Sequence, residues 1–436
     1  MFSRNEAEKR LRELSREDLI KIILVLSSEM EQLKEAFEQL KNKLAMYENP
    51  HTPSSQQRFK PETKKEPDQD KPRFPGAPLN HKGAGIRLPK PDKIIEHKLN
   101  DKKLKLVGKY TRTVIEFVDK PIEIIEHIIY QYKTKDGHVI EPEVDLPDGI
   151  YGKHLQVFLS ELKTIGGISY EKMSNLVKAL RSDISICPAT VLSLIDGVAK
   201  NLEQPRKNVL QKLRNSLFVQ ADETGMRQDG ENGYVWAFCN PDYALYEFDP
   251  TRARAVAERM LGNNFLGYTV NDGYNAYEHF KHQRCWVHIL READALGESY
   301  QEASLQVKLL HEMYDQATAA KGEPPDKRRE IIENLRGQTE LGHIIEVLKV
   351  TDGCKKFSGT LQRALPHLFI GVEHPEIPLH NNFAERTIRP VVVHRKMMGC
   401  IRNEKGKRLI NNLLSMVQTW RLQGKPLHKM LIKYAN

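Results

Sequence analysis

Two apolar runs of β-type sequence, far apart in the chain, are each followed by an aspartate. Residues 217–221 (LFVQA) precede Asp222, and residues 266–270 (LGYTV) precede Asn271 and Asp272. Such runs predict strands of a buried sheet, so both aspartates are expected at or just past strand ends, at a rim where α/β proteins commonly bind ligands. For either aspartate alone, a turn or cap residue is the better interpretation.

A third acid, Glu385, belongs to a predicted helix. It lies in the segment HNNFAERTIRP, where Asn381 or Asn382 suits the N-cap and apolar residues recur at helical spacing. Pro390 is expected to end or kink this helix early. Three acids in the order strand, strand, helix form a pattern that isolated turn residues do not explain.

Three carboxylates of this kind suit divalent cations, which prefer hard oxygen ligands. A pair of such ions about 4 Å apart activates the attacking oxygen and stabilises the leaving oxygen when a phosphodiester is cleaved. The sequence therefore predicts a phosphoryl-transfer site in which Asp222, Asp272 and Glu385 hold two Mg²⁺ or Mn²⁺ ions. Glu223 is a competing candidate, but alternation along a strand turns only one of the two neighbouring acids toward the site.

The segments ADET, NDGYNAY, RCWVHILRE and NNFAERTIRPVVVHRK resemble the transposases of the insertion-sequence sixty-six group, a DDE class with a ribonuclease-H-like core. The resemblance extends over most of the chain. It implies that the protein cleaves DNA at the ends of a mobile element and joins the 3′ ends to target DNA, with Asp222, Asp272 and Glu385 as the catalytic triad. It also favours Asp222 over Glu223, because the aspartate of DET is the catalytic residue of the family motif.

The catalytic core is expected in two parts, residues 213–295 and 379–436, separated by a helical insertion over residues 296–378. The insertion would cover the DNA end or act only as a spacer. Cys285 and His288 come just before the insertion. Two potential ligands at CxxH spacing are too few for a zinc site, which needs at least three protein ligands. The resemblance implies a structural motif with His288 beneath the active site, while a buried cysteine and a helix-end histidine remain an equal alternative.

Within the core, several elements follow from periodicity. Residues 233–240 and 244–249 predict two antiparallel strands, and residues 252–261 predict a helix. Residues 407–421 predict an amphipathic helix that closes the core.

The formal net charge of +9 favours a polyanionic partner. Residues 381–436 hold twelve Lys or Arg and only two acids, although an ordinary solvated basic face would show the same excess. The side chains expected to contact DNA phosphates are Arg386, Arg389, Arg395, Lys396 and Arg402.

Residues 1–48 predict a coiled-coil helix. From Leu19 to Tyr47 apolar residues alternate steps of four and three, a seam of about four heptads that favours pairing into a homodimer or higher oligomer over folding back. Residues 49–92 are rich in Pro, Lys, Gln and Ser, which predicts a flexible linker.

Residues 93–150 show β-type alternation and predict a small domain. The resembling family carries a zinc-binding pair of CxxC motifs there, but residues 1–186 of this chain contain no cysteine. The histidines of the region have no matched ligand spacing and are interpreted as solvent-facing. Residues 155–205 predict three short helices, compatible with a helix-turn-helix or with a structural bundle.

Two other functions stay open at this point: a structure-specific nuclease without strand transfer, and a non-catalytic DNA-binding protein derived from a transposase. The expected partners are terminal inverted repeats, target DNA and element-encoded accessory proteins. The five cysteines show no paired framework, and no apolar stretch approaches 18 residues. A cytoplasmic, nucleoid-associated protein is therefore expected, with no membrane partner.

Overall fold

The chain was studied as a computed structural model, which describes residues 27–32, 34, 37, 121–130, 132–133, 139–140, 143, 146–147, 149–337 and 341–436. Most of the predicted coiled coil, the linker and most of the small domain lie outside these residues. Within the small domain, β1 (Tyr132–Lys133) pairs antiparallel with β2 (Val139–Ile140). No described helix has the length and apolar character needed to cross a bilayer.

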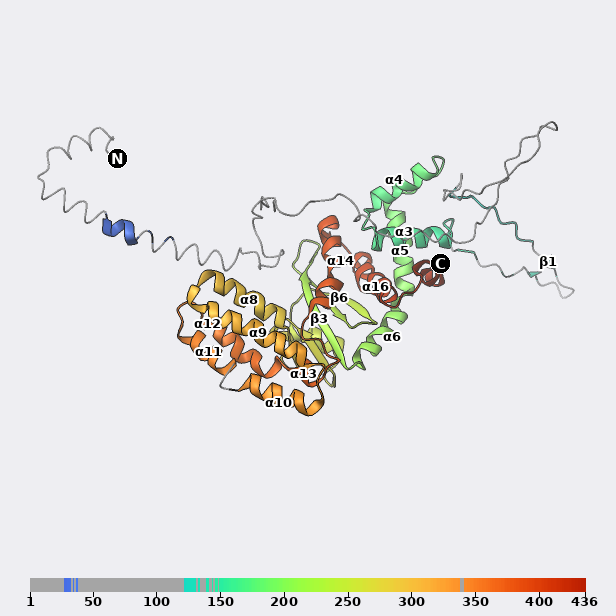
Figure 1. Ribbon diagram of the computed structural model, residues 1–436. Coiled ribbons are helices and arrows are strands. Elements are labelled where there is room, and N and C mark those ends of the chain that lie inside the picture. Colours follow the sequence, from blue (N-terminus) through green and yellow to red (C-terminus); the bar gives the residue numbers. More distant parts are fainter. Residues whose placement is uncertain are drawn as a thin grey trace, which may run out of the picture.

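A five-stranded mixed sheet forms the centre of the molecule (Figure 1). Its strands lie in the order β6-β5-β3-β7-β8 and are β3 (Phe218–Gly225), β5 (Tyr234–Cys239), β6 (Ala244–Asp249), β7 (Tyr268–Asn271) and β8 (His282–Arg284). The first three strands form the predicted antiparallel meander, whereas β7 and β8 run parallel to β3. A short parallel pair, β4 (Arg227–Gln228) with β9 (Cys400–Ile401), lies outside this sheet.

Alternation along β5 sends its side chains into two cores. Trp236 and Phe238 pack in the cluster that holds α6 (Glu203–Arg214) and α7 (Arg254–Leu261). Val235 and Ala237 face the other way, against α14 (Asn382–Met398). The sheet is therefore covered on both faces, as its apolar strands require.

Helices precede the sheet where residues 155–205 predict them: α3 (Lys153–Thr164), α4 (Tyr170–Leu180) and α5 (Pro188–Asn201). Ser169 caps α4 by accepting a hydrogen bond from the backbone N–H of Lys172. The helix α6, which follows directly, was not predicted. These helices share one hydrophobic core with the sheet, and sequence reading by them stays a prediction.

The insertion predicted over residues 296–378 is helical, and it has a core of its own that begins earlier than predicted, with α8. It comprises α8 (Trp286–Ser299), α9 (Ser304–Ala320), α10 (Pro325–Arg336), α11 (Leu341–Val350), α12 (Lys355–Ala364) and α13 (Ile370–Glu373). In Figure 1 these helices form a body on one side of the sheet, opposite α3, α4 and α5. Gln283 of β8 joins the two parts, because its side chain donates to the carbonyl of Leu368 and accepts from the N–H of Gly371.

The helix α14 begins at Asn382 and continues through Pro390 to Met398. Proline removes one backbone hydrogen bond from the helix. The buried side chains of Ile388 and Val391, on either side of the proline, pack against the sheet and hold the helix together. Pro390 was expected to end or kink this helix early. The helix does not end there.

The free edge of β6 is covered by α15 (Glu404–Arg408), a π-helical turn (η4, Leu409–Leu414) and α16 (Ser415–Leu422). Polar side chains spaced four residues apart accept hydrogen bonds from alternate N–H groups of the strand: Asn411 from Phe248 (2.9 Å), Ser415 from Tyr246 (2.8 Å) and Thr419 from Ala244 (3.1 Å). Residues 407–421 are helical and pack against the core, as predicted, but residues 409–417 are all buried and residues 409–414 form a π-helical turn that was not predicted. An edge satisfied in this way cannot pair with another chain.

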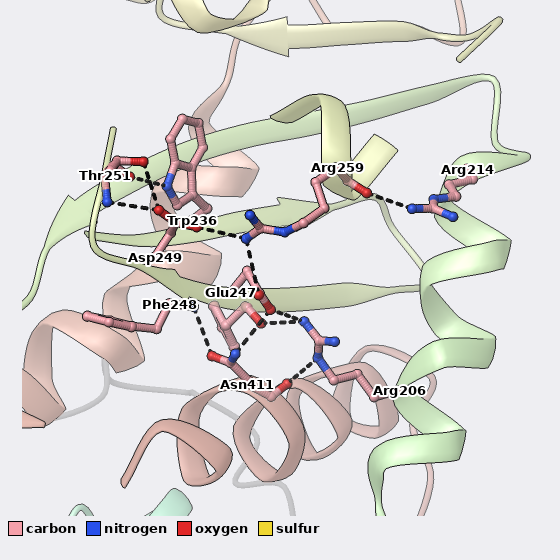
Figure 2. A network of polar contacts seen from close by, with 10 residues as sticks. Arg206, Arg214, Trp236, Glu247, Phe248, Asp249, Thr251, Arg259 and Asn411 are labelled. Atoms are coloured by element: carbon pink, nitrogen blue, oxygen red, sulfur yellow. Dashed lines mark hydrogen bonds and ion pairs between the residues drawn. The ribbon is translucent and has the colours of Figure 1, made fainter. Parts of the chain in front are cut away.

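A network of polar contacts ties α6 and α7 to this edge (Figure 2). Arg206 of α6 forms an ion pair with Glu247 of β6 and donates to the carbonyl of Asn411 at 2.7 Å. The side-chain amide of Asn411 donates to Glu247 as well, at 3.1 Å. Arg259 of α7 lies 3.4 Å from Glu247 and 2.8 Å from Asp249. Four elements thus meet at one carboxylate.

Lys163 of α3 is fully buried, and burial lowers its pKa to about 8. Its ammonium group donates to the carbonyl of Ile168 (3.2 Å) and lies 4.4 Å from the centre of the Tyr170 ring. Neither contact is a counter-charge, so the protonated lysine is costly at this position.

Lys163→Met is expected to stabilise the protein at about pH 7 and to remove a pH-dependent part of its stability. The unfolded lysine titrates near its ordinary value of 10.5, so between pH 8 and 10.5 the unfolded chain binds more protons and stability rises with pH. The gain from about pH 7 to about pH 9.5 is about 2 kcal/mol. Urea unfolding of both proteins measures it, and parallel pH curves would contradict the assignment.

Candidate active site

The sheet opens next to Asp222. Strands β3 and β7 pair only as far as Gln220 and Val270, and beyond that point β3 continues to Gly225 against β5 alone. Asp272 follows β7 directly, two residues beyond Val270, just as Asp222 is two residues beyond Gln220 on β3. Because neighbouring strands are about 4.8 Å apart, this register brings the two acids into the same region, and the negative charge of Asp272 acts on Asp222. Asp222 itself lies inside β3 rather than at or past its end as predicted, because the antiparallel pairing with β5 extends the strand.

Asp222 faces α14, the helix that carries Glu385. Gln220, on the same face of β3, accepts a hydrogen bond from the N–H of Ala384 in the first turn of α14 (3.3 Å). Asn381, the N-cap residue, does not cap the helix with its side chain but donates to the carbonyl of Ala221 at 2.8 Å. The start of α14 is therefore fixed against the strand beside Asp222.

Glu223 points to the opposite face and is already paired. Its carboxylate accepts hydrogen bonds from Arg252 Nε (2.9 Å) and from the hydroxyl of Tyr277 (3.0 Å), and its side chain is only 2% exposed. Among the side-chain contacts of the described residues, Asp222 has no such partner, since it accepts only from the backbone N–H of Glu223 at 2.9 Å. The two neighbouring acids thus face opposite sides of the strand, as alternation predicts. Glu223 has side-chain partners, whereas Asp222 has none among the described residues.

The acids act on one another electrostatically. Burial raises the pKa of Asp222 well above its usual value, and the negative charges of Glu223, Asp272 and Glu385 raise it further. The hydrogen bond from the backbone N–H of Glu223 opposes this shift. A nearby positive charge would oppose this shift and favour the ionised carboxylate.

The loop that carries Asp272 is held in one conformation. Asp272 Oδ1 accepts from the N–H of Tyr274 at 3.0 Å, and Gly273 has a φ of 86° that favours glycine. A Cβ atom at Gly273 would lie 2.3 Å from Nη1 of Arg284, whose guanidinium covers the loop. A side chain at residue 273 would therefore strain the backbone next to Asp272 and displace the guanidinium of Arg284.

Glu385 contacts α8 instead of the two aspartates. Its Oε1 lies 3.4 Å from Arg291 Nη1 and 3.6 Å from His288 Nε2. Burial lowers the pKa of His288, whereas the charges of Asp272 and Glu385 oppose this shift. The buried thiol of Cys285 accepts from the N–H of Asn381 at 3.1 Å. Cys285 thus contacts the residue that precedes α14, and His288 contacts Glu385 in the first turn of that helix. Within the described residues, no zinc ligand set forms around this CxxH pair.

The three carboxylates supply the hard oxygen ligands that Mg²⁺ and Mn²⁺ prefer. In the described part of the chain, however, no three His, Cys, Asp or Glu side chains lie close enough to hold one ion together. Glu385 is turned toward Arg291 and His288. The donor types fit a divalent cation, and a cation would compete with Arg291 for Glu385.

Comparison with known proteins decides the family. A family profile described as "Transposase IS66 family" matches residues 148–409, well over half of the chain. The chain belongs to this family. An uncharacterized protein of Sinorhizobium fredii, y4jO, is 23% identical over 188 residues, which cover 41% of this chain and 57% of that relative. The chain thus spans less than two thirds of the relative it matches, and no solved structure matches it.

The part of the chain that matches the IS66 family contains all three acids. It also contains Arg291, which sequence reasoning missed although it follows His288 by three residues on one helix, a spacing that puts both side chains on the same face. Tyr277 and Arg252, the partners of Glu223, were missed too. Nothing in their sequence context signals the contact.

The basic residues predicted to contact DNA occupy different positions. Arg386 and Arg389 line a cavity of about 270 Å³ together with Asn382 and Glu385. Arg395 is engaged within the protein, since it donates to Thr224 Oγ1 at 3.1 Å and to the carbonyl of Gly225. Lys396 and Arg402 are exposed and further from the acids along the chain.

Proposed function

We propose that this IS66-family transposase cleaves phosphodiester bonds at the ends of a mobile element and joins the 3′ ends to target DNA. The observation that supports the proposal is that the charges of Asp272, which follows β7, and of Glu385, in the first turn of α14, both act on the buried Asp222 of β3. A sheet of this kind, with α14 on one face, is compatible with a ribonuclease-H-like core.

In the proposed site the three acids hold two Mg²⁺ or Mn²⁺ ions, which supply positive charge to the attacking and leaving oxygens. A proton and a metal ion would compete for the Asp222 carboxylate, whose pKa is raised by burial and by the neighbouring acids. Arg291 and His288 orient Glu385 while the metal is absent. The proposed nucleophiles are water and then the freed 3′ hydroxyl, so no covalent enzyme intermediate is required.

The chemistry then proceeds in two in-line substitutions. In the first, water attacks the phosphorus at the element end, the bond to the 3′ oxygen breaks, and a 3′ hydroxyl and a 5′ phosphate result. In the second, that 3′ hydroxyl attacks a phosphorus of target DNA, and the target's own 3′ oxygen leaves. Arg386 and Arg389, beside Glu385, are positioned to hold flanking phosphates.

The further parts of the proposal concern assembly. A paired N-terminal helix would bring two active sites to two element ends, with terminal inverted repeats, target DNA and element-encoded accessory proteins as partners. A location at the nucleoid follows from DNA as the substrate.

The products formed on a defined substrate test the function. Linear DNA carrying the inverted repeats that flank the gene is incubated with full-length protein, Mg²⁺ and a target plasmid, and accessory proteins encoded by the element are added. We expect 3′ hydroxyl ends at the repeats and joined plasmid products. Cleavage without joining would indicate the nuclease alternative, and binding without cleavage would indicate a non-catalytic DNA-binding protein.

A further inference from the structure

A larger groove adjoins the proposed active site. Its volume is about 540 Å³, and it lies between α14, α16 and the turn that follows α3. Arg386 and Arg389 line both this groove and the smaller cavity at Glu385. The two hollows therefore follow one another along α14.

The groove is positively charged without local compensation. Arg386 and Arg389 of α14 and Arg421 of α16 line it and are exposed, whereas no aspartate or glutamate lines it. In the described part of the chain, none of the three forms an ion pair. Three such charges favour a ligand with several negative groups.

Apolar side chains line the same groove. Ile165 is 54% exposed and Val393 is 45% exposed, and Pro390 and Leu422 complete the walls. A DNA duplex presents phosphates and sugars to such a surface but keeps its bases stacked inside. An unpaired strand presents its phosphates, which a positively charged groove follows, and also the flat apolar face of a base, which these aliphatic side chains would cover from water.

The wall that comes from the α3 turn is fixed against α14. Gly167 has a φ of 64°, and a Cβ atom there would lie 2.9 Å from Met397 Sδ, so the turn packs directly on the helix. The buried Lys163 holds the same turn through the carbonyl of Ile168. The groove is therefore formed before any ligand binds.

We infer that the groove holds a single-stranded segment of the DNA substrate next to the cleaved bond. Its phosphates contact Arg386, Arg389 and Arg421, and an unpaired base lies against Ile165 and Val393. This inference rests on the proposed function for its DNA substrate. It adds Arg421 and the turn over residues 164–167 to the DNA-binding surface, and it requires the element end to open beside the active site.

The test uses full-length protein and two fluorescent probes: an oligothymidylate of about 10 nucleotides, within the usual site size of single-strand grooves, and a blunt hairpin duplex. Arg421→Gln and Val393→Glu are expected to weaken oligothymidylate binding about tenfold, with a smaller effect on the hairpin. Arg421→Gln should also lower the salt slope by about 0.7. Arg329→Gln is the matched control, because Arg329 is an exposed arginine on α10, paired with Asp326.

A photoreactive thymidine in the oligonucleotide locates the bound strand. Crosslinks are expected in peptides that contain residues 386–397 or 415–422. Crosslinks only elsewhere, or equal loss of hairpin and single-strand binding, would overturn the inference. If crosslinks map to the groove but variants of the three acids still cleave DNA, the proposed active site fails and the groove stands. If the wild type cleaves normally but no crosslinks map to the groove, the proposed function stands and the groove inference fails.

Discussion

Glu385→Gln is expected to lower metal-dependent cleavage of element-end DNA by at least about a thousandfold, while DNA binding changes by less than about twofold. Glutamine keeps the size and shape of the side chain but removes the charge that would hold the cation. The exposed arginines that follow on α14 remain in place. Single-turnover cleavage in Mg²⁺ and Mn²⁺, with fluorescence anisotropy for binding, measures the two effects separately.

Two comparisons sharpen this prediction. Asp222→Asn and Asp272→Asn should behave like Glu385→Gln, and double variants should be little worse than single ones, because the acids act as one unit. Glu404→Gln, an exposed acid further along the basic C-terminal segment, is the control that should cleave normally. Normal cleavage by the Glu385 variant with both Asp variants inactive would mean that the third acid is misassigned. Glu373 and Glu376 would be the next to test.

Arg206→Met is expected to destabilise the protein by about 3 kcal/mol, the lower end of what breaking a buried ion pair costs. The substitution leaves Glu247 partly buried, with Asn411 and Arg259 as its described polar partners, and it removes the donor to the carbonyl of Asn411 (Figure 2). Methionine retains much of the apolar stem. Urea unfolding gives the free energy difference.

The neighbouring residue on the same helix supplies the control. Lys207 pairs with Glu203 at 2.7 Å, but both side chains are more than half exposed, so Lys207→Met should cost less than about 0.5 kcal/mol. In the double variant Arg206→Met with Glu247→Gln, the loss should be smaller than the sum of the single losses. Equal effects of the Arg206 and Lys207 substitutions would show that the network does not hold α6 to the sheet.

Elements with a long, regular apolar pattern could be predicted from the sequence. The strands β5 and β6 and the helices α9 to α12 occur where the sequence indicates them. The strands are continuous apolar runs that are buried on both faces, and burial in the helices repeats about every 3.6 residues. The course of α14 through Pro390 could not be predicted. It depends on contacts with strands more than a hundred residues earlier in the chain, which no local pattern contains.

The same distinction applies to the candidate site. The sequence places each aspartate near a strand end, because an apolar run of β-type residues precedes it, but it does not indicate that β3 continues past Asp222 to Gly225. The contact of Glu385 with Arg291 depends on how α8 lies against α14, and the arginine groove is assembled from three segments far apart in sequence. Arg395 was predicted from the sequence to contact a DNA phosphate, yet its side chain donates a hydrogen bond to Thr224 at the end of β3.

The most direct measurement is the position of the metal itself. Full-length protein bound to element-end DNA is loaded with Fe²⁺ in place of Mg²⁺ and treated with ascorbate and hydrogen peroxide, so that radicals formed at the ion cut the nearby polypeptide. If Asp222, Asp272 and Glu385 hold the ion, cuts appear together near all three residues, excess Mg²⁺ suppresses them, and Asp222→Asn abolishes them. Cuts confined to other parts of the chain, or cuts that Asp222→Asn leaves unchanged, would contradict the three-acid metal site.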